Sequence, residues 1–477
     1  MANKKTWRET SIKLFGIITI LVIIGFSMVA CDDGNGGGGG TEPPPPPDIV
    51  NPPPPPANTG PSVSRVTITA SLASMETGST FTFTASVAGA NDPAQTVNWS
   101  IVDAEKTKRG TQFGTGEQVG VLTVDPDETL TSLTIKASSA VDGTKVDEKT
   151  FDIKKVTNPN FFVFNSETGT ISNYVGTSSS EIIIPSAIRG TPVRTLGDGT
   201  NSISMSTTNL VIPDSVTTIA NNAFQSNYSI RSITIGDTGN STVTIGDNAF
   251  YNSYYLVNVT IRSRVTTIGN NAFQGTQLTS LVLPNSVTTI GNNAFTGTYL
   301  DIVDIPNSVT TIGNNAFAGT KLTRVTIGTG VTTIGTGAFQ STQLATVTIP
   351  NNVTSIGAGA FAYINTLTSV TIGTGVITLG DNAFYASVSD SDNKLTSVTL
   401  NIVPTTTTSI GNSVFNGGVL TSIIMGAANV PIKSDTFSSN GFETLYLGTA
   451  NRQAGTYTRT RTVTGDTVSF GTWARQS

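Results

Sequence analysis

The side chains that enzymes use most often for catalysis are scarce in this chain of 477 residues. It contains no histidine, which excludes serine–histidine–aspartate triads, cysteine–histidine pairs and histidine-bound metal sites. A glycoside hydrolase needs two converging carboxylates, and the 31 aspartate and glutamate residues single out no such pair. We therefore predict that the protein is not an enzyme and has no cofactor or metal site.

One acidic stretch has part of the composition of a calcium-binding loop. Asp390, Asp392 and Asn393 lie close together, but the glycine and the final glutamate of an EF-hand are missing. This pattern favours a solvated loop over a metal site.

The single cysteine, Cys31, stands directly after a segment typical of export signals. A basic stretch ends at Lys13, and an apolar run covers residues 14–30. The sequence Ser-Met-Val-Ala-Cys over residues 27–31 resembles the lipobox of bacterial lipoproteins. That resemblance implies that residues 1–30 are a cleaved signal peptide and that Cys31 carries the lipid. An uncleaved membrane anchor is the alternative, because the apolar run is just long enough to span a bilayer.

Two or three acyl chains would hold the protein durably on a membrane. We therefore expect it at the bacterial outer membrane or the cell surface. The formal net charge is -5, and it becomes -8 without residues 1–30, in which four basic residues outweigh Glu9. Since no basic stripe remains to attract a phosphate backbone, nucleic acid is excluded as a partner.

Two segments precede the repeats that make up most of the chain. Residues 31–62 are rich in glycine and proline and are expected to form a linker stalk, although a ligand for proline-recognising modules is the alternative. Residues 63–156 alternate apolar and polar side chains in short runs, which predicts a β-sandwich. Their sequence resembles the bacterial Ig-like group 2 domain, in which Trp99 would face the core. Such domains act as spacers or as adhesive units, and the sequence leaves both open.

A phrase of nine residues, Val-Thr-Thr-Ile-Gly-Asn-Asn-Ala-Phe, occurs three times in the second half of the chain. Its phenylalanine recurs every 22 residues from Phe273 to Phe361. A period in the twenties predicts a solenoid. Related units carry further phenylalanines, namely Phe224, Phe250, Phe384, Phe415 and Phe437. We expect this column to fill the wall of the coil rather than to form a ligand cage, and the longer units to project loops such as residues 388–393.

Each unit opens with a Leu-x-x-Val-x-Ile strand whose alternate residues point inward. Twelve such strands, from near Ile183 to near Tyr446, are expected to form a continuous parallel sheet. Gly291 would permit a tight corner, and Asn292 would cap a short helical turn. The units resemble the type 5 leucine-rich repeats of BspA-like bacterial surface proteins over residues 160–447.

The predicted fold class is therefore all-β-dominated: an Ig-like β-sandwich followed by a leucine-rich-repeat solenoid with a parallel sheet and short helical turns. Residues 448–477 are expected to form a capping hairpin over the open end of the stack, from strands at residues 455–459 and 468–473. Tyr457, Phe470 and Trp473 would pack in this cap rather than bind a ligand.

The outward side of the strands is the default binding surface, because packing fixes the inward side chains. Most outward residues are threonine or serine, so the departures are the candidates for binding. They form two sets: Arg231, Asn258 and Arg262, and then Asp301, Asp304 and Arg324. The alternative is that these charges only aid solubility.

The BspA-like resemblance implies an adhesin that binds extracellular proteins such as fibronectin or fibrinogen, or other bacteria. We expect a monomer that is attached to the membrane through its N-terminal lipid. Two other classes stay open: a structural surface or spacer protein that binds nothing, and an accessory lipoprotein that binds glycans.

Overall fold

The computed structural model describes residues 60–476 except 71, 73, 115–118, 237–240, 263, 387–393, 417–418, 434, 438–452, 460, 465–466 and 471. Cys31, the linker up to residue 59, the acidic stretch at Asp390 and the strand expected near Tyr446 lie outside these residues. The described chain consists almost entirely of strands, turns and irregular connections, and its two helices are single 3-10 turns, η1 (Ala104–Lys106) and η2 (Pro159–Phe161). The predicted fold class is confirmed. No helix in the described ranges is long and apolar enough to cross a membrane.

The first part of the described chain is a β-sandwich of two four-stranded sheets. One sheet contains, in spatial order, β1 (Ser62–Thr69), β3 (Thr80–Ala90), β6 (Val119–Thr123) and β5 (Gln112–Phe113). The other contains β2 (Ser74–Glu76), β8 (Val146–Lys154), β7 (Ser132–Ser139) and β4 (Val97–Ile101). Trp99 packs against the core with its ring 5.7 Å from that of Phe113, as predicted. The assignment to the Ig-like group 2 family stays a prediction.

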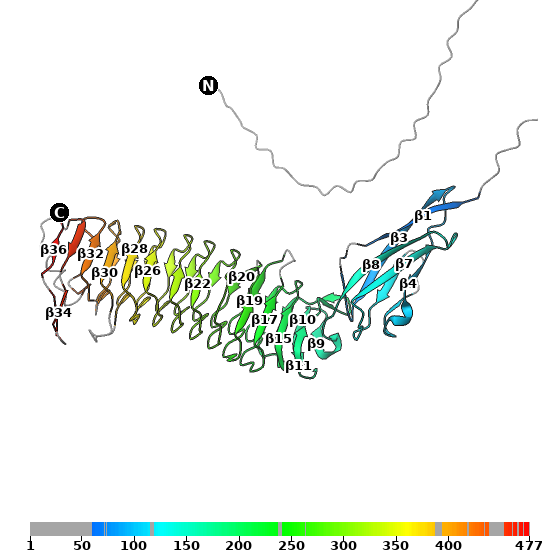
Figure 1. Ribbon diagram of the computed structural model, residues 1–477, viewed down its shortest axis with the longest axis horizontal. Coiled ribbons are helices and arrows are strands. Elements are labelled where there is room, and N and C mark those ends of the chain that lie inside the picture. Colours follow the sequence, from blue (N-terminus) through cyan, green and yellow to red (C-terminus); the bar gives the residue numbers. More distant parts are fainter. Residues whose placement is uncertain are drawn as a thin grey trace, which may run out of the picture. The chain divides into compact units, whose positions relative to one another are not determined.

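The solenoid follows, and Figure 1 shows its coils stacked in chain order from β9 to β32. One side of the stack is a sheet of twelve short strands, parallel except for the first pair. Eight of them consist of only two residues, which are the Thr-Ile pair of the nine-residue phrase or its variants Thr-Leu and Ser-Ile. In order they are β9 (Phe162–Asn165), β10 (Thr170–Tyr174), β14 (Thr195–Leu196), β16 (Thr218–Ile219), β18 (Val243–Ile245), β20 (Val265–Ile268), β21 (Thr289–Ile290), β23 (Thr311–Ile312), β25 (Thr333–Ile334), β27 (Ser355–Ile356), β29 (Thr378–Leu379) and β31 (Ser409–Ile410).

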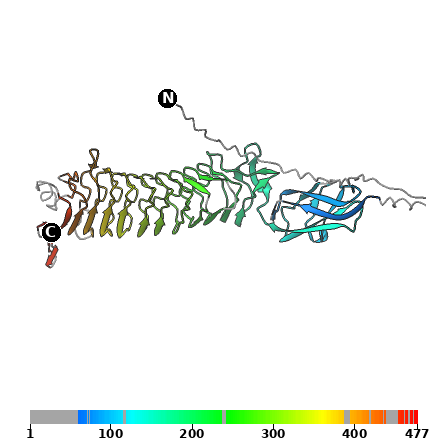
Figure 2. The same cartoon turned by 90° about the horizontal axis from the view of Figure 1, so that it is seen from above.

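The Leu-x-x-Val-x-Ile strands form the second side, which we call the strand face. Its sheet is interrupted. One segment contains β11 (Ser179–Ile183), β15 (Thr207–Ile212), β17 (Ser232–Ile235) and β19 (Asn258–Thr260); the next contains β22 (Ile302–Asp304) and β24 (Arg324–Thr326); the last begins with β26 (Thr346–Ile349), β28 (Ser369–Ile372), β30 (Ser397–Leu400) and β32 (Ser422–Met425). At the position expected near Val282 there is only an isolated bridge between Ser280 and Asn258. The prediction of a continuous sheet here was wrong, and the continuous sheet lies on the phrase side. Figure 2 shows the strands as successive rungs of the stack.

A small antiparallel pair, β12 (Ala187–Ile188) and β13 (Thr191–Pro192), precedes the regular coils. The coils share one core, which the phenylalanine column fills. Successive rings from Phe224 to Phe437 stack with centroids 4.9 to 5.5 Å apart and interplanar angles of at most 17°. The members from Phe224 to Phe415 are at most 1% exposed. The prediction that the column is structural is confirmed.

The corners beside this column are hydrogen-bonded turns rather than short helices. The side chain of Asn292 does not cap a helix; its Oδ1 accepts a hydrogen bond of 2.8 Å from the backbone N–H of Asn314 in the next coil. Asn270 accepts in the same way from Asn292, and Asn314 from Thr336. These side chains form a ladder along the stack, which we call the asparagine ladder. It satisfies backbone donors that each turn would otherwise leave unpaired.

Gly291 and Gly313 are needed for a reason other than the expected corner geometry. Neither has a positive φ, which is the conformation that favours glycine. A Cβ at Gly313 would instead lie 2.5 Å from the carbonyl carbon of Gly291 in the preceding coil. The coils therefore approach one another at this corner with only backbone between them.

The end of the chain forms a cap whose strands pair differently from the prediction. β33 (Gly455–Thr458) pairs antiparallel with β32 and with β36 (Ala474–Arg475), while β34 (Arg461–Thr464) pairs with β35 (Thr467–Phe470). The two predicted strands thus do not form a hairpin with each other. Tyr457 and Trp473 are 1% and 9% exposed and belong to the solenoid core, as predicted. The side chain of Phe470 lies outside the described part.

Candidate functional site

All six residues predicted to bind are exposed, and they lie on or next to the strand face. Asn258 begins β19, Asp304 ends β22 and Arg324 begins β24. The other three flank strands. They are Arg231, directly before β17, Arg262, two residues after β19, and Asp301, directly before β22.

The second set lies together where the strand sheet is broken. Strands β22 and β24 are parallel, with Ile302 opposite Arg324 and Asp304 opposite Thr326. The Asp301 carboxylate accepts a hydrogen bond of 2.6 Å from the hydroxyl of Thr323. In the described chain, Asp304 and Arg324 make no ion pair with each other or with another residue. Their charges are therefore not neutralised within the protein.

Two apolar side chains accompany these charges, and the sequence reasoning missed both. Val282 is 80% exposed and Ile302 is 43% exposed. Threonine or serine is usual at these two positions: Thr260 stands 22 residues before Val282, and Ser280 stands 22 residues before Ile302. They would have been found by comparing equivalent positions of the repeats and noting apolar residues, as well as charged ones, that replace threonine or serine. We call Val282, Asp301, Ile302, Asp304 and Arg324 the central patch.

The structure divides the first predicted set. Arg231 joins three exposed tyrosines, with its guanidinium carbon 5.3 Å from the ring centroid of Tyr255, while Tyr228 and Tyr254 stack with centroids 6.0 Å apart. Tyr228 and Arg231 line a cleft of about 500 Å³ whose other residues are serines and threonines. Arg262 lies beyond the other end of β19, so it is not part of this cluster.

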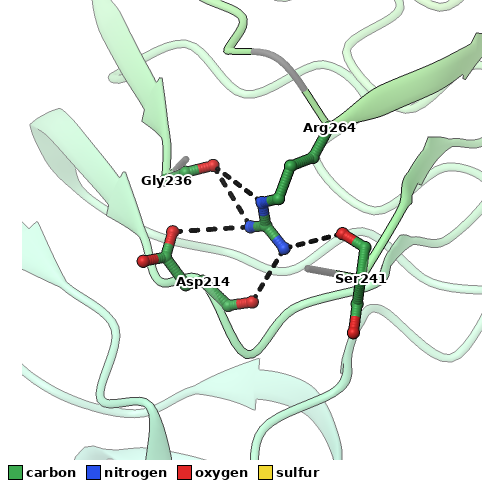
Figure 3. A network of polar contacts seen from close by, with 4 residues as sticks. All are labelled: Asp214, Gly236, Ser241 and Arg264. Carbon is green, nitrogen blue, oxygen red and sulfur yellow. Dashed lines mark hydrogen bonds and ion pairs between the residues drawn. The ribbon is translucent and has the colours of Figure 1, made fainter. Parts of the chain in front are cut away.

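Arg264 differs from all the candidates because it is buried, with 6% of its side chain exposed. Figure 3 shows its guanidinium between two neighbouring coils. It donates to the carbonyl oxygens of Asp214, Gly236 and Ser241 and forms an ion pair of 3.5 Å with the Asp214 carboxylate. Ser286 occupies the equivalent position one period later. Arg264 therefore satisfies backbone carbonyls of the longer unit between Phe224 and Phe250 and of the coil before it, which is a structural role.

A further polar cleft, of about 570 Å³, lies at the start of the twelve-stranded sheet and includes Asp198. Hydrogen bonds from the backbone N–H groups of Asn201 and Thr200, and from the Thr200 hydroxyl, hold the pKa of the Asp198 carboxyl well below its usual range. The carboxylate is thus engaged within its own loop. No group of three or more acidic or cysteine side chains in the described residues is arranged to hold a metal ion.

Comparison with protein families gives a match over most of the chain. The family described as BspA type Leucine rich repeat region matches in six copies, over residues 144–277, 196–317, 266–391 and 390–460. No curated protein matches the sequence.

Several solved structures are similar to this chain. A leucine rich cell surface protein from Faecalibacterium prausnitzii is 26% identical, with 59% of this chain and 84% of that chain covered and a TM-score of 0.37. A leucine-rich repeat protein from Bacteroides ovatus is 18% identical, with 50% and 92% covered and a TM-score of 0.25. The pneumococcal vaccine antigen PcpA is 18% identical, with 58% and 88% covered and a TM-score of 0.24.

Proposed function

Because this chain belongs to the BspA-type leucine-rich repeat family, we propose that it is an exported surface protein that binds extracellular proteins through its strand face. Proteins built from such repeats have inward side chains that are fixed by packing and outward side chains that are free to vary. Proteins of the host matrix or plasma, such as fibronectin and fibrinogen, and the surfaces of other bacteria are the ligands to test first.

The central patch is the observation that carries this proposal. It combines exposed apolar side chains, Val282 and Ile302, with the unneutralised charges of Asp304 and Arg324. Protein interfaces typically bury apolar anchors and arginine at their centre, surrounded by a polar rim. The threonines and serines of the neighbouring strands supply such a rim. Strand propensity alone explains the threonines of the rim. It does not account for Val282, which is 80% exposed and lies outside every strand of the described chain.

We propose that the cluster of Arg231 with Tyr228, Tyr254 and Tyr255 extends the same binding surface toward the start of the stack. Tyrosine and arginine are enriched among residues that dominate binding energy. The guanidinium of Arg231 has no hydrogen-bond or ion-pair partner in the described chain, so its donors are available to a ligand.

A lipid anchor on Cys31 would place this surface outside the cell, at the bacterial outer membrane or cell surface. The support for the anchor is the lipobox-like sequence of residues 27–31, and its test is the mass of the N-terminal peptide of the mature protein. A peptide that begins at Cys31 and carries acyl chains is the expected result. An intact leader with an unmodified cysteine would contradict it.

The binding proposal is tested by immobilising fibronectin, fibrinogen and fixed bacterial cells and measuring adsorption of the full chain. We expect saturable binding to at least one of them, and loss of that binding in a variant with both Asp304→Ala and Arg324→Ala. The double variant Thr348→Ala with Thr371→Ala, which changes exposed or half-buried residues of β26 and β28, is the matched control and should bind as the wild type. Absence of saturable binding to every surface would instead favour the spacer role.

A further inference from the structure

A third cleft lies on the turn side of the stack, away from the strand face, and its walls contain two tyrosines. It has a volume of about 490 Å³ and is formed by turns of four successive coils. Tyr363 is 48% exposed, and its ring centroid lies 5.4 Å from that of Tyr385 at an interplanar angle of 77°. One ring thus meets the other edge to face inside an open cleft.

Tyr363 has a backbone conformation that its residue type disfavours. Its φ is 59°, in the left-handed region, where a bulky side chain is a rare exception. Tyr363 is the second residue after Phe361 of the phenylalanine column. At the equivalent position of other coils, the described residues with positive φ have small or amide side chains: Ser226, Asn252, Gly275, Gly297, Gly319 and Ser341. The stacking of the coils imposes this conformation. The backbone N–H of Tyr363 donates to the carbonyl oxygen of Tyr385 in the next coil, and the N–H of Ser341 donates in the same way to the carbonyl oxygen of Ala362.

A side chain that costs the fold stability and is half exposed does not serve packing. Strained residues of this kind gather at ligand sites, where the surrounding structure holds them in place. The tyrosine at this position therefore points to a role that glycine, serine and asparagine cannot fill in the other coils.

The remaining walls define the chemistry of a ligand. Gln340, Asn382 and Asn416 contribute side-chain amides that have no hydrogen-bond partner in the described residues, so each offers both donors and an acceptor. Asp381 contributes a carboxylate, of which Oδ1 already accepts from the backbone N–H of Asn412 at 2.6 Å. No lysine or arginine is among the described residues that line the cleft, which disfavours an anionic ligand.

We propose that this cleft binds a neutral saccharide. A pyranose ring has an apolar C–H face that packs on an aromatic ring, and hydroxyl groups that exchange hydrogen bonds with amides and carboxylates. Tyr363 and Tyr385 match the first feature, and the amides with Asp381 match the second. The volume is in the usual range for sites that enclose small ligands. This site is distinct from the central patch, so it adds a glycan-binding activity to the proposed protein-binding one.

The test uses the full chain and three neutral oligosaccharides, maltotriose, cellotriose and N-acetyllactosamine, with a heparin tetrasaccharide and tetramethylammonium as charged probes. Saturation-transfer NMR and calorimetry should show binding of at least one neutral oligosaccharide through its ring C–H protons. Tyr385→Ala and Tyr363→Ser should each weaken that binding at least tenfold. Tyr251→Ala, at the position in its own coil that corresponds to Tyr385, is the matched control and should leave the affinity unchanged.

Stability separates this role from a structural one. Because Ser341 occupies the same left-handed position one coil earlier, Tyr363→Ser should keep or raise the melting temperature while it removes saccharide binding. The proposal would be overturned if no neutral oligosaccharide bound, if only a charged probe bound, if both tyrosine variants bound normally, or if Tyr363→Ser melted below the wild type. Adsorption to protein ligands through the central patch should be unchanged in Tyr363→Ser, so the two proposals fail independently.

Discussion

The two long sides of the solenoid follow different rules. On the phrase side, twelve strands form one unbroken sheet, and all but the first contain a threonine–isoleucine pair or one of its variants, threonine–leucine and serine–isoleucine. On the strand face, the sheet is interrupted around Val282 and again between β24 and β26, next to residues that depart from the repeat. The sheet is therefore continuous on the side whose residues repeat. The residues vary on the strand face, where side chains are free to contact a partner.

Both sides of the solenoid depend on the phenylalanine column, which holds neighbouring coils together. Phe317 is fully buried, with ring centroids 5.2 Å from Phe295 and 5.3 Å from Phe339. Phe317→Ala should lower the free energy of unfolding by about 3–5 kcal/mol, because it leaves a cavity that contacts two further coils. Urea denaturation followed by circular dichroism measures this loss. Tyr299→Ala, at a residue that is 51% exposed, is the control, and equal losses in the two variants would contradict the account.

Arg264 stabilises a part of the stack in which the repeat departs from 22 residues, since Phe224 and Phe250 are 26 residues apart. Arg264→Ser, which installs the residue found at Ser286, should lower the free energy of unfolding by about 2–3 kcal/mol, since it leaves buried carbonyl oxygens without a donor. The same denaturation experiment applies. Arg324→Ser changes an exposed arginine that makes no ion pair in the described chain, and it should have little effect on stability. If the Arg264 variant were as stable as the Arg324 variant, the network in Figure 3 would have no structural role.

The asparagine ladder should contribute less, because Asn292 and Asn314 each accept only one hydrogen bond from the next coil. Asn292→Ala removes the acceptor of the Asn314 N–H and should cost about 1 kcal/mol. The neighbouring Asn293 has φ 54°, a conformation that glycine adopts at Gly337 and Gly359. Asn293→Gly should therefore be close to neutral. Hydrogen exchange of the Asn314 amide gives a direct readout, and unchanged protection in Asn292→Ala would rule out the ladder.

Val282 should show the smallest effect on stability. Val282→Thr restores the residue found at Thr260, and the side chain is 80% exposed, so the free energy of unfolding should change by less than about 0.5 kcal/mol. A larger loss in the denaturation midpoint would mean that Val282 holds the interrupted sheet together, and the strand face would then not be free to vary.

The repeat period and the apolar pattern were enough to predict the solenoid, the phenylalanine column and the exposure of the six candidate residues. These features follow from a local pattern of residues that is repeated in every coil. The position of the continuous sheet could not be predicted, because Thr289–Ile290 is too short to be recognised as a strand until neighbouring coils pair with it. The sequence also indicated two strands in the cap, but it did not show which strands they pair with. The pairing in the cap does not follow the repeat, so no period predicts it.

The candidate site was predicted only in part, for a related reason. Charged departures such as Asp304 and Arg324 are visible against a background of threonine and serine. The aromatic group around Arg231 was not, because Tyr228 and Tyr255 precede their strands and only the stacked coils bring them together with the arginine. Arg264 looked like Arg262 in sequence, and only burial distinguishes them.

We propose that the residues of the strand face that differ from the repeat, and not the repeating residues, bind the partner. The most direct measurement compares adsorption of the wild type with that of a variant carrying Val282→Thr, Ile302→Ser, Asp304→Thr and Arg324→Ser, on immobilised fibronectin, fibrinogen and bacterial cells. This variant rewrites the central patch in residues that the chain itself uses at equivalent positions. We predict at least a tenfold loss of affinity, about 1.4 kcal/mol or more, with an unchanged melting temperature. Wild-type affinity in this variant would contradict the account and move the binding site away from the strand face.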